Sequence, residues 1–251
     1  MKLLDRIGID VGRRLRLEEA IAWAAAHDVR YIDSQLDTAD NVFTSFDDAR
    51  AAGIRRACKE HGIHLGLHTL SAVNVAEYSP FVAEAVDQYL RGYVEVYGSL
   101  GAEWIVVHAG YHFTSDKDLR MEVGLERLKR LVDYAEQKNA LILLENLNKE
   151  PADAEMHYLA HTIEEWEWPG LSMRSIRAGD KSRVEEVRLA DCFRNGQEIH
   201  LKPDAGDLDF ADMFRRIEGK GFTGHYMNAF GSLDDMLAAR DDLARHAEAA
   251  G

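Results

Sequence analysis

The stretch WIVVHAGYHFTSDKDLRMEVGLERLKRLVDYAEQKNALILLE (residues 104–145) contains one complete strand–helix–strand pattern. Two short apolar runs, residues 104–109 and 141–145, stand at its ends. Between them, residues 117–138 repeat apolar side chains at the 3.6-residue period of an amphipathic helix. Near-continuous apolar runs are typical of strands that are buried on both faces. The stretch therefore predicts two parallel strands joined by a helix.

The same alternation continues along the whole chain of 251 residues. Further strands are expected at residues 7–11, 31–36, 65–70, 171–176, 186–191 and 225–228. Further helices are expected at residues 17–27, 47–61, 79–100, 152–166, 209–219 and 232–249. Eight strands alternating with helices predict an α/β fold, a (β/α)₈ TIM barrel, as a single domain over residues 1–251. A doubly wound sheet is the alternative, but IGIDVGRR (residues 7–14) is not the glycine-rich turn that normally follows its first strand.

The region after the sixth expected strand is irregular. Residues 177–183 (RAGDKSR) are too short and too polar for a full helix, so the helix after strand six is expected to be shortened or missing. Without that helix, one side of the barrel would expose apolar strand surface. A partner chain, or residues 166–168 folding over it, could cover this surface. We therefore expect a homodimer.

The charge balance limits the classes of partner. Acidic residues number 44 and basic residues 30, which gives a formal net charge of −14. A nucleic-acid binder usually shows a basic footprint, so we expect no nucleic-acid partner and no attraction to an anionic membrane. No apolar run approaches the roughly 18–20 residues that span a bilayer, and the N-terminus lacks the signal-peptide pattern. Two cysteines cannot form a disulfide framework, so the expected location is cytoplasmic.

Ligand-type side chains end three consecutive expected strands, at His68, His108 and Glu145. Sites in TIM barrels form at the carboxyl ends of the strands. Two imidazoles and a carboxylate can hold a divalent cation such as manganese, zinc, cobalt or magnesium. A single strand-end histidine is more often a hydrogen-bonded core residue. For the three residues together, a metal site and a hydrogen-bonded core are given about equal weight. Lys149 or Arg194 is the alternative partner for the Glu145 carboxylate.

Other polar residues lie near expected strand ends. His112 follows His108 in the next loop, and Asp191 ends strand seven, with Arg194, Glu198 and His200 downstream. A second histidine pair, His157 and His161, has the four-residue spacing of a helix but lacks the glutamate of zinc-protease helices. We interpret this pair as a surface pair.

Several motifs carry a resemblance to a known family. Residues 145–149 (ENLNK) are similar to the E-x-L-N-[RK] run after strand five in ketose 3-epimerases. Residues 198–210 resemble the H-x-x-P-G-x-G-D-x-D-F stretch, and residues 220–224 (KGFTG) resemble the lead into strand eight. In this order and spacing, the chain resembles the xylose isomerase-like TIM barrels over nearly its whole length. That group includes sugar isomerases, epimerases and the family-2 AP endonucleases.

The resemblance implies a metal-assisted sugar or polyol isomerase or epimerase that moves a proton next to a carbonyl. Glu145 would bind the metal and act as acid or base, with His68 and His108 at the histidine positions of the AP-endonuclease branch. His200 or Glu198 would supply a second proton carrier. Substrate contacts are expected from Lys149, Arg194, Asp191 and His112, and the substrate would be a small sugar-like molecule.

The sequence also departs from the family pattern. The strand-six aspartate has no counterpart in residues 171–176, the strand-seven histidine falls at Arg188, and the strand-eight glutamate falls at Asn228 or Ala229. Asp204 stands where the family favours glycine. Three alternatives therefore stay open. They are a metal-dependent lyase or dehydratase, phosphodiester cleavage, and a catalytically altered barrel without enzymatic activity.

Overall fold

The computed structural model describes residues 2–38, 40–147, 149–162, 165, 184–193 and 199–250. Contacts within the chain divide it into two compact units. Unit 1 comprises Met1–Ser34, Ala57–Leu65 and Lys181–Gly251, and unit 2 comprises Gln35–Arg56 and Gly66–Asp180. The single domain predicted over residues 1–251 stays a prediction.

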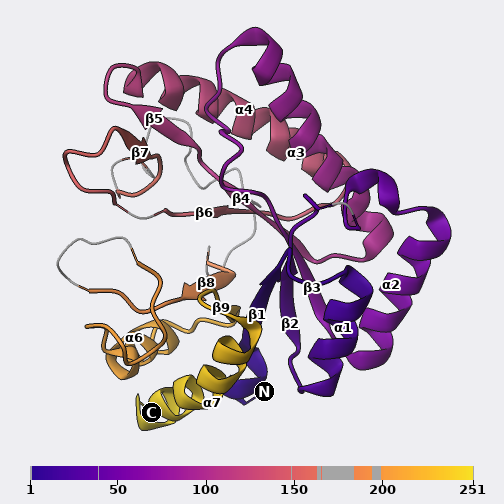
Figure 1. The fold of residues 1–251 in the computed structure, drawn as a ribbon, viewed down its shortest axis with the longest axis vertical. Coiled ribbons are helices and arrows are strands. Elements are labelled where there is room, and N and C mark those ends of the chain that lie inside the picture. The colour runs from indigo at the N-terminus through magenta and orange to yellow at the C-terminus, as the bar shows by residue number, and fades with distance from the viewer. Residues whose placement is uncertain are drawn as a thin grey trace. The chain divides into compact units, whose positions relative to one another are not determined.

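Unit 1 is built on four parallel strands. They are β1 (Ile7–Gly12), β2 (Tyr31–Ser34), β8 (Glu186–Leu189) and β9 (His225–Asn228). Their order is β2-β1-β9-β8. The helical segments are η1 (Leu3–Arg6), α1 (Leu17–Ala26), α6 (Phe210–Glu218) and α7 (Leu233–Ala250). Helices α6 and α7 pack side by side (Figure 1), and Phe214 and Tyr226 belong to the apolar core of this unit.

Unit 2 contains the parallel strands β3 (His64–His68), β4 (Trp104–His108) and β6 (Ile142–Glu145), in the order β3-β4-β6. The first two residues of β3 belong to unit 1. Its helices are η2 (Phe43–Ser45), α2 (Asp48–His61), α3 (Pro80–Leu100) and α4 (Lys117–Gln137), and the last five residues of α2 belong to unit 1. Helices α3 and α4 pack against each other (Figure 1).

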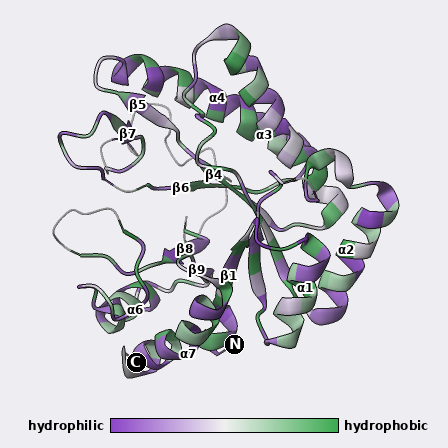
Figure 2. Ribbon diagram, in the orientation of Figure 1, coloured by the Kyte–Doolittle hydropathy of each residue, from purple (hydrophilic) through white to green (hydrophobic). Residues whose placement is uncertain are grey.

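Local sequence explains where α3 begins and ends. Pro80 stands at its first turn, where a missing N–H costs no hydrogen bond. Gly101 ends the helix in the left-handed conformation with φ of 72°, which glycine adopts without steric cost. Figure 2 shows apolar and polar residues alternating along α3 and α4, as expected for helices with one buried face. No helix of the described chain is long and apolar enough to cross a membrane.

Seven of the eight predicted strands are present among the described residues, and the pairs that these seven form within each unit are parallel. Six of the predicted helices, α1 to α4, α6 and α7, are also present within one to two residues of their predicted bounds. The remaining strand, predicted at residues 171–176, and the shortened helix after it lie outside the described residues.

One predicted helix is wrong. Part of the segment predicted as a helix over 152–166 is instead β7 (Met156–Tyr158), which pairs antiparallel with β5 (Tyr111–Phe113). His157 therefore lies opposite His112 in a two-stranded ribbon, and it is not on a helix with His161. The helical period in HYLAH is local, whereas the ribbon depends on a partner strand more than 40 residues earlier in the chain. Residue spacing alone could not reveal that partner.

Candidate metal centre

His68, His108 and Glu145 are the last residues of three strands in unit 2, β3, β4 and β6. The parallel register places His108 beside Glu145 and His68 beside Val106, so the three side chains leave neighbouring strand ends. Their donor atoms converge. His68 Nε2 lies 3.0 Å from Glu145 Oε2, and His108 Nε2 lies 3.3 Å from both of these atoms. The predicted metal ligands are therefore brought together.

These distances fit one small cation. Zinc binds histidine nitrogen and carboxylate oxygen at about 2.0–2.2 Å, so two ligands at 90° to 109° lie about 3.0–3.5 Å apart. The three donor atoms are spaced in this range. Among the described residues, theirs is the only group of three or more His, Cys, Asp or Glu side chains that could hold a metal ion. Two histidines and one carboxylate leave further coordination positions open, as in catalytic metal centres.

Thr69 orients the imidazole of His108. Thr69 Oγ1 lies 3.4 Å from His108 Nδ1, and the Thr69 N–H donates to the Val106 carbonyl at 3.0 Å. A hydrogen bond at Nδ1 turns the other ring nitrogen of His108 toward the cluster, which is a common arrangement around metal-binding histidines. Both imidazoles are buried and Glu145 is half-buried. Bringing a carboxylate into such a place is costly without a positive partner.

The structure places His112 elsewhere in unit 2. It lies in β5, where its Nδ1 is 2.9 Å from the Phe113 carbonyl and its ring stacks on His157 at 5.6 Å between centroids. His157 Nδ1 is 3.9 Å from Glu150 Oε2, and Glu150 in turn accepts the Tyr158 N–H. The ribbon thus carries a second group of titratable side chains. The only signal of this group in the sequence was the four-residue spacing of His157 and His161, which we interpreted as a surface pair on a helix.

Asp191 in unit 1 holds a loop together. It is completely buried, and its carboxylate accepts the backbone N–H groups of Cys192, Gly206 and Leu208 at 2.8–3.1 Å. A Cβ at Gly206 would lie 2.4 Å from Asp191 Oδ1, so only glycine allows this approach. These bonds are structural, and the predicted contact of Asp191 with substrate stays a prediction.

The remaining predicted site residues are exposed or outside the described residues. Lys149 and His200 are exposed. Arg194 and Glu198 lie outside the described residues. The roles predicted for these four residues therefore stay predictions.

Two departures from the family pattern have local explanations in unit 1. Asn228 ends β9 fully buried, and its Nδ2 donates to the Met236 carbonyl on α7 at 3.0 Å. The side chain at the position of the family glutamate is thus bonded to a helix. Asp204 has φ of 68°, a conformation that glycine adopts most easily, which explains the family preference there.

Unit 1 contains an ionic cluster that sequence reasoning missed. The guanidinium of Arg188 on β8 contacts Asp10 of β1 at 2.5 Å, Asp33 of β2 at 2.7 Å and Glu186 at 2.8 Å. All four side chains are at most 16% exposed. The signal available in the sequence was an arginine inside an apolar strand pattern. Two of its three carboxylate partners, Asp10 and Asp33, lie more than 150 residues away on β1 and β2, so spacing could not identify them.

An aromatic stack lies beside this cluster. Tyr31 is sandwiched between His64 and His225, with ring centroids 4.5 and 4.7 Å away, and His225 Nε2 lies 3.0 Å from Glu186 Oε2. Each of these four residues is the first of its strand. Gly8 on β1 has no side chain because a Cβ there would lie 2.5 Å from the Tyr31 carbonyl oxygen. Polar and aromatic groups, rather than aliphatic ones, fill this part of unit 1.

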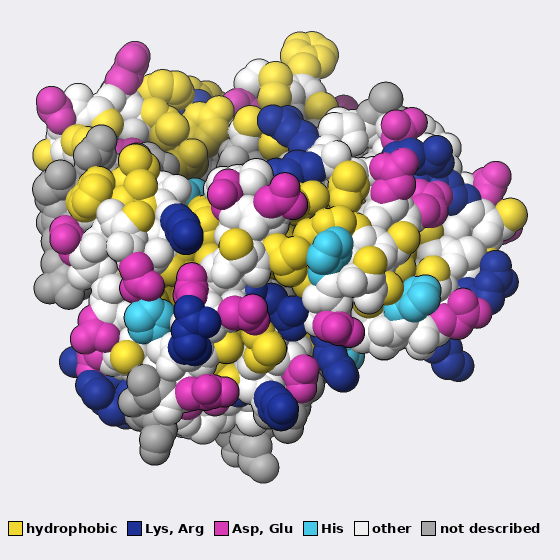
Figure 3. All heavy atoms as spheres, turned by 60° about the horizontal axis from the view of Figure 1, so that its bottom comes forward, with side chains coloured by type: hydrophobic (Ala, Val, Ile, Leu, Met, Phe, Trp, Pro, Cys, Tyr) yellow, Lys and Arg dark blue, Asp and Glu magenta, His cyan; other side chains and the backbone are white. Residues whose placement is uncertain are grey.

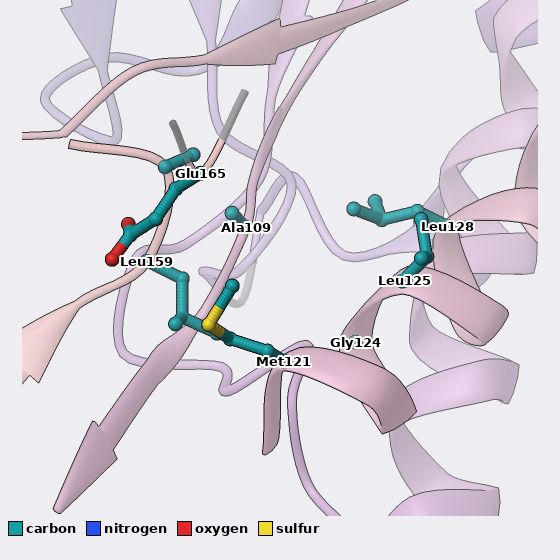
Figure 4. A pocket seen from close by; sticks show the side chains of 8 residues that line it. Ala109, Met121, Gly124, Leu125, Leu128, Leu159 and Glu165 are labelled. Atoms are coloured by element: carbon teal, nitrogen blue, oxygen red, sulfur yellow. The ribbon is translucent and has the colours of Figure 1, made fainter. Parts of the chain in front are cut away.

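Unit 2 also has an apolar pocket that the three ligands do not line. It is lined by Ala109, Met121, Gly124, Leu125, Leu128, Leu159, Ala160 and Glu165. Figure 4 shows Met121 and Leu159 approaching each other from α4 and from the segment after β7. Glu165 is buried at this pocket and pairs with Lys117 at 2.7 Å. None of the predicted site residues lines it.

Comparisons with known proteins identify the family. The family model described as xylose isomerase-like TIM barrel matches residues 21–247. By sequence, the chain has no significant match among curated proteins.

Solved structures resemble this one at low sequence identity. A D-tagatose 3-epimerase-like protein has a TM-score of 0.75, 16% identity and 98% of each chain covered. The 3-keto-D-glucoside 4-epimerase from E. coli has a TM-score of 0.70, 14% identity and coverage of 96% of this chain and 98% of that one. D-psicose 3-epimerase from Clostridium cellulolyticum H10 has a TM-score of 0.66, 15% identity and coverage of 98% and 96%.

The similarity to solved structures supports the fold, and the family match covers most of the chain. The predicted fold class, a TIM barrel, is thereby confirmed. The chain belongs to the xylose isomerase-like TIM barrel family.

Proposed function

We propose that this protein is a metal-assisted isomerase or epimerase of a small sugar or polyol. The observation that carries the proposal is the convergence of His68, His108 and Glu145, whose donor atoms lie 3.0–3.3 Å apart at three strand ends. The similar structures include a tagatose 3-epimerase-like protein, a ketoglucoside 4-epimerase and a psicose 3-epimerase, which supports a sugar-like substrate.

A divalent ion at this centre would polarise a substrate carbonyl and make the neighbouring C–H more acidic. His68 and His108 would hold the ion through their Nε2 atoms and Glu145 through Oε2. A carboxylate has two oxygens, so Glu145 can also accept the substrate proton and return it. In the proposal, His200 serves as a second proton carrier.

Substrate hydroxyl groups would be bound by Lys149, Arg194, Asp191 and His112. The ring of His112 stacks on the ring of His157 within unit 2. A cytoplasmic location and a homodimer are part of the proposal.

Phosphodiester cleavage is less well supported. The chain carries a net charge of −14, and Figure 3 shows acidic and basic side chains interspersed on the face that it draws. A protein that holds a polyphosphate backbone usually shows a basic footprint. In addition, Arg188 stands where the resemblance implies a metal-binding histidine, and its guanidinium contacts three carboxylates.

A metal-dependent lyase or dehydratase is the second candidate. The observation that favours it is Asn228, which stands at the position of the family glutamate and donates to the Met236 carbonyl. A relay between two glutamates would then lack one member. A lyase needs one base and one metal ion, for which Glu145 and its two histidines suffice.

Metal content tests the proposal first. We expect about one divalent ion per chain in the purified protein, and its loss in Glu145→Gln, because one of three ligands is weakened. Glu150→Gln is the matched control, since Glu150 is a buried acid of the same unit whose Oε2 accepts the Tyr158 N–H. If both variants retain the same ion content as the native protein, the centre is not a metal site.

The reaction class is tested in deuterated water with a panel of ketoses. An isomerase or epimerase exchanges the proton next to the carbonyl and yields a sugar of the same mass apart from deuterium. A lyase or dehydratase yields a product that has lost water or carbon. Loss of the activity in Glu145→Gln, but not in Glu150→Gln, is expected in either case. A native protein that binds metal but exchanges no proton on any ketose contradicts the isomerase assignment.

A further inference from the structure

Two tyrosines of α3, the buried Tyr93 and the half-buried Tyr89, contact the backbone at the end of β3 and just after it in unit 2. Tyr93 is completely buried, and its hydroxyl lies 2.9 Å from the carbonyl oxygen of His68. The same hydroxyl accepts the Leu36 N–H at 3.0 Å. One helical turn earlier, the Tyr89 hydroxyl accepts the Leu70 N–H at 2.8 Å. The two hydroxyls therefore bond to the chain at His68 and two residues beyond it.

This network holds further polar groups. The Tyr93 hydroxyl lies 2.9 Å from Asp37 Oδ2, so the Asp37 carboxylate and the His68 carbonyl are alternative acceptors for its proton. Burial raises the pKa of both tyrosines, and Asp37 raises it further. Both hydroxyls therefore stay protonated at neutral pH.

The rings are held as firmly as the hydroxyls. Tyr89 and Tyr93 meet edge to face at 5.3 Å, and Phe43 contacts both rings at 5.9 and 5.1 Å. Gly92 lies beside Phe43, where a Cβ would come within 2.8 Å of the Phe43 ring. Side chains packed in this way have few rotamers, so the hydroxyl positions are well defined.

We propose that Tyr93 and Tyr89 are positioning residues for His68, and that they set the affinity and geometry of the centre formed by His68, His108 and Glu145. This inference rests on the proposed metal site. Neither tyrosine contacts the His68 imidazole through a bond that the structure shows. They act by fixing the backbone on the carboxyl side of the His68 Cα, at the His68 carbonyl and at the Leu70 N–H, which limits the directions that the imidazole can take. Thr69 acts similarly on His108 through its hydroxyl.

Without the hydroxyl of Tyr93, the Leu36 N–H and the His68 carbonyl lose a shared partner, and the end of β3 gains freedom. Outer partners of metal-binding residues typically change metal affinity by about 10–100-fold. We expect the lower end of this range, about tenfold, for Tyr93→Phe, because the effect passes through the backbone. Tyr89→Phe is expected to have a smaller effect, since the Tyr89 hydroxyl bonds to Leu70 and not to His68 itself.

Cobalt binding to the full-length protein tests the inference, because Co²⁺ reports both affinity and ligand geometry through its visible absorption. The native protein, Tyr93→Phe, Tyr89→Phe, Glu145→Gln and Tyr226→Phe are titrated in parallel. Tyr226→Phe is the matched control. It removes a hydroxyl from another completely buried tyrosine, which donates to Glu218 in unit 1 at 2.6 Å. General destabilisation would affect both kinds of variant.

Weaker Co²⁺ binding and an altered absorption band in Tyr93→Phe, with Tyr226→Phe unchanged, are the expected results. If Tyr93→Phe does not fold, the same changes in Tyr89→Phe carry the test. Native affinity and spectrum in the folded tyrosine variants, with binding lost in Glu145→Gln, overturn the positioning role and leave the metal site in place. A native protein that binds no Co²⁺ overturns the proposed metal site itself.

Discussion

The two units gather charged side chains in opposite ways. In unit 2, two imidazole nitrogens and a carboxylate oxygen converge within 3.0–3.3 Å at the carboxyl ends of β3, β4 and β6. In unit 1, the carboxylates of Asp10, Asp33 and Glu186 converge on the guanidinium of Arg188. The second cluster has a positive charge of its own, whereas the first consists of donor atoms that suit an added cation.

The comparison shows that one cluster of charged side chains can stabilise the fold while another provides ligands for a metal ion. An arginine cannot lose its charge in a protein, so a cluster built around it is closed to metal ions. Neutral histidines with a carboxylate have the donor atoms that a divalent ion requires. Substitutions of Arg188 and His68 test the two sides of this contrast, and substitution of Lys117 tests a smaller ion pair in unit 2.

Removing the arginine is expected to have the largest effect on stability. Arg188→Met leaves three buried carboxylates without their shared partner, and breaking a buried pair in this way costs about 3–5 kcal/mol. Urea unfolding measures the loss. Arg130→Met is the control, since Arg130 is exposed and pairs with Asp87 at the surface. Its expected cost is at most about 1 kcal/mol. If the two variants are equally stable, the buried cluster does not support the fold.

Adding metal is expected to stabilise the protein by a smaller amount. At a free manganese concentration of 100 times the dissociation constant, the free energy of unfolding should rise by about 2.7 kcal/mol. His68→Ala should lose this increment. His246→Ala should keep it, because His246 lies in unit 1 and pairs with Asp204. An increment that persists in His68→Ala would place the bound ion elsewhere.

The smallest effect is expected at Glu165, an acid of unit 2 that already has a cationic partner. Burial alone would raise the pKa of Glu165, but Lys117 and His161 outweigh burial and lower the pKa below its ordinary value of 4.5. The ion pair therefore contributes stability above that pH, and the contribution is lost as the pH falls through the lower, folded-state pKa.

Lys117→Met should consequently destabilise the protein by about 0.5–1 kcal/mol at pH 7, because the lysine is partly exposed. The difference from the native protein should shrink on acidification below about pH 4.5. Urea unfolding at both pH values measures it, with the exposed pair of Lys129 and Glu126 as a control. A difference that does not depend on pH would show that Lys117 acts through packing rather than charge.

The candidate site could be predicted only where its residues follow local rules. His68, His108 and Glu145 were found because each ends an apolar run, and parallel strands place their ends side by side. Arg188 also stood out in a strand, but its three carboxylate partners did not. Asp10 and Asp33 lie 178 and 155 residues away on other strands, and no local pattern connects them with Arg188. Glu186 lies two residues away on the same strand, where the strand period places it on the same face as Arg188.

The ribbon of β5 and β7 is a second feature that local sequence could not predict. HYLAH fits a helical period, yet the backbone of Met156–Tyr158 pairs with Tyr111–Phe113. Short segments have weak intrinsic preferences, so a distant partner strand decides their conformation. Asn228 is a similar case, since its direction toward Met236 depends on where α7 packs.

The sequence by itself determined the alternation of strands and helices, the strand ends that carry His68, His108 and Glu145, and the boundaries of helices such as α3. These features depend on apolar periodicity and on Pro80 and Gly101, which act within a few residues. Only the tertiary structure decided that the three ligands converge, that Arg188 is neutralised, and that two tyrosines hold the end of β3. Such contacts join residues far apart in the chain, and only close packing of the folded strands and helices brings them together.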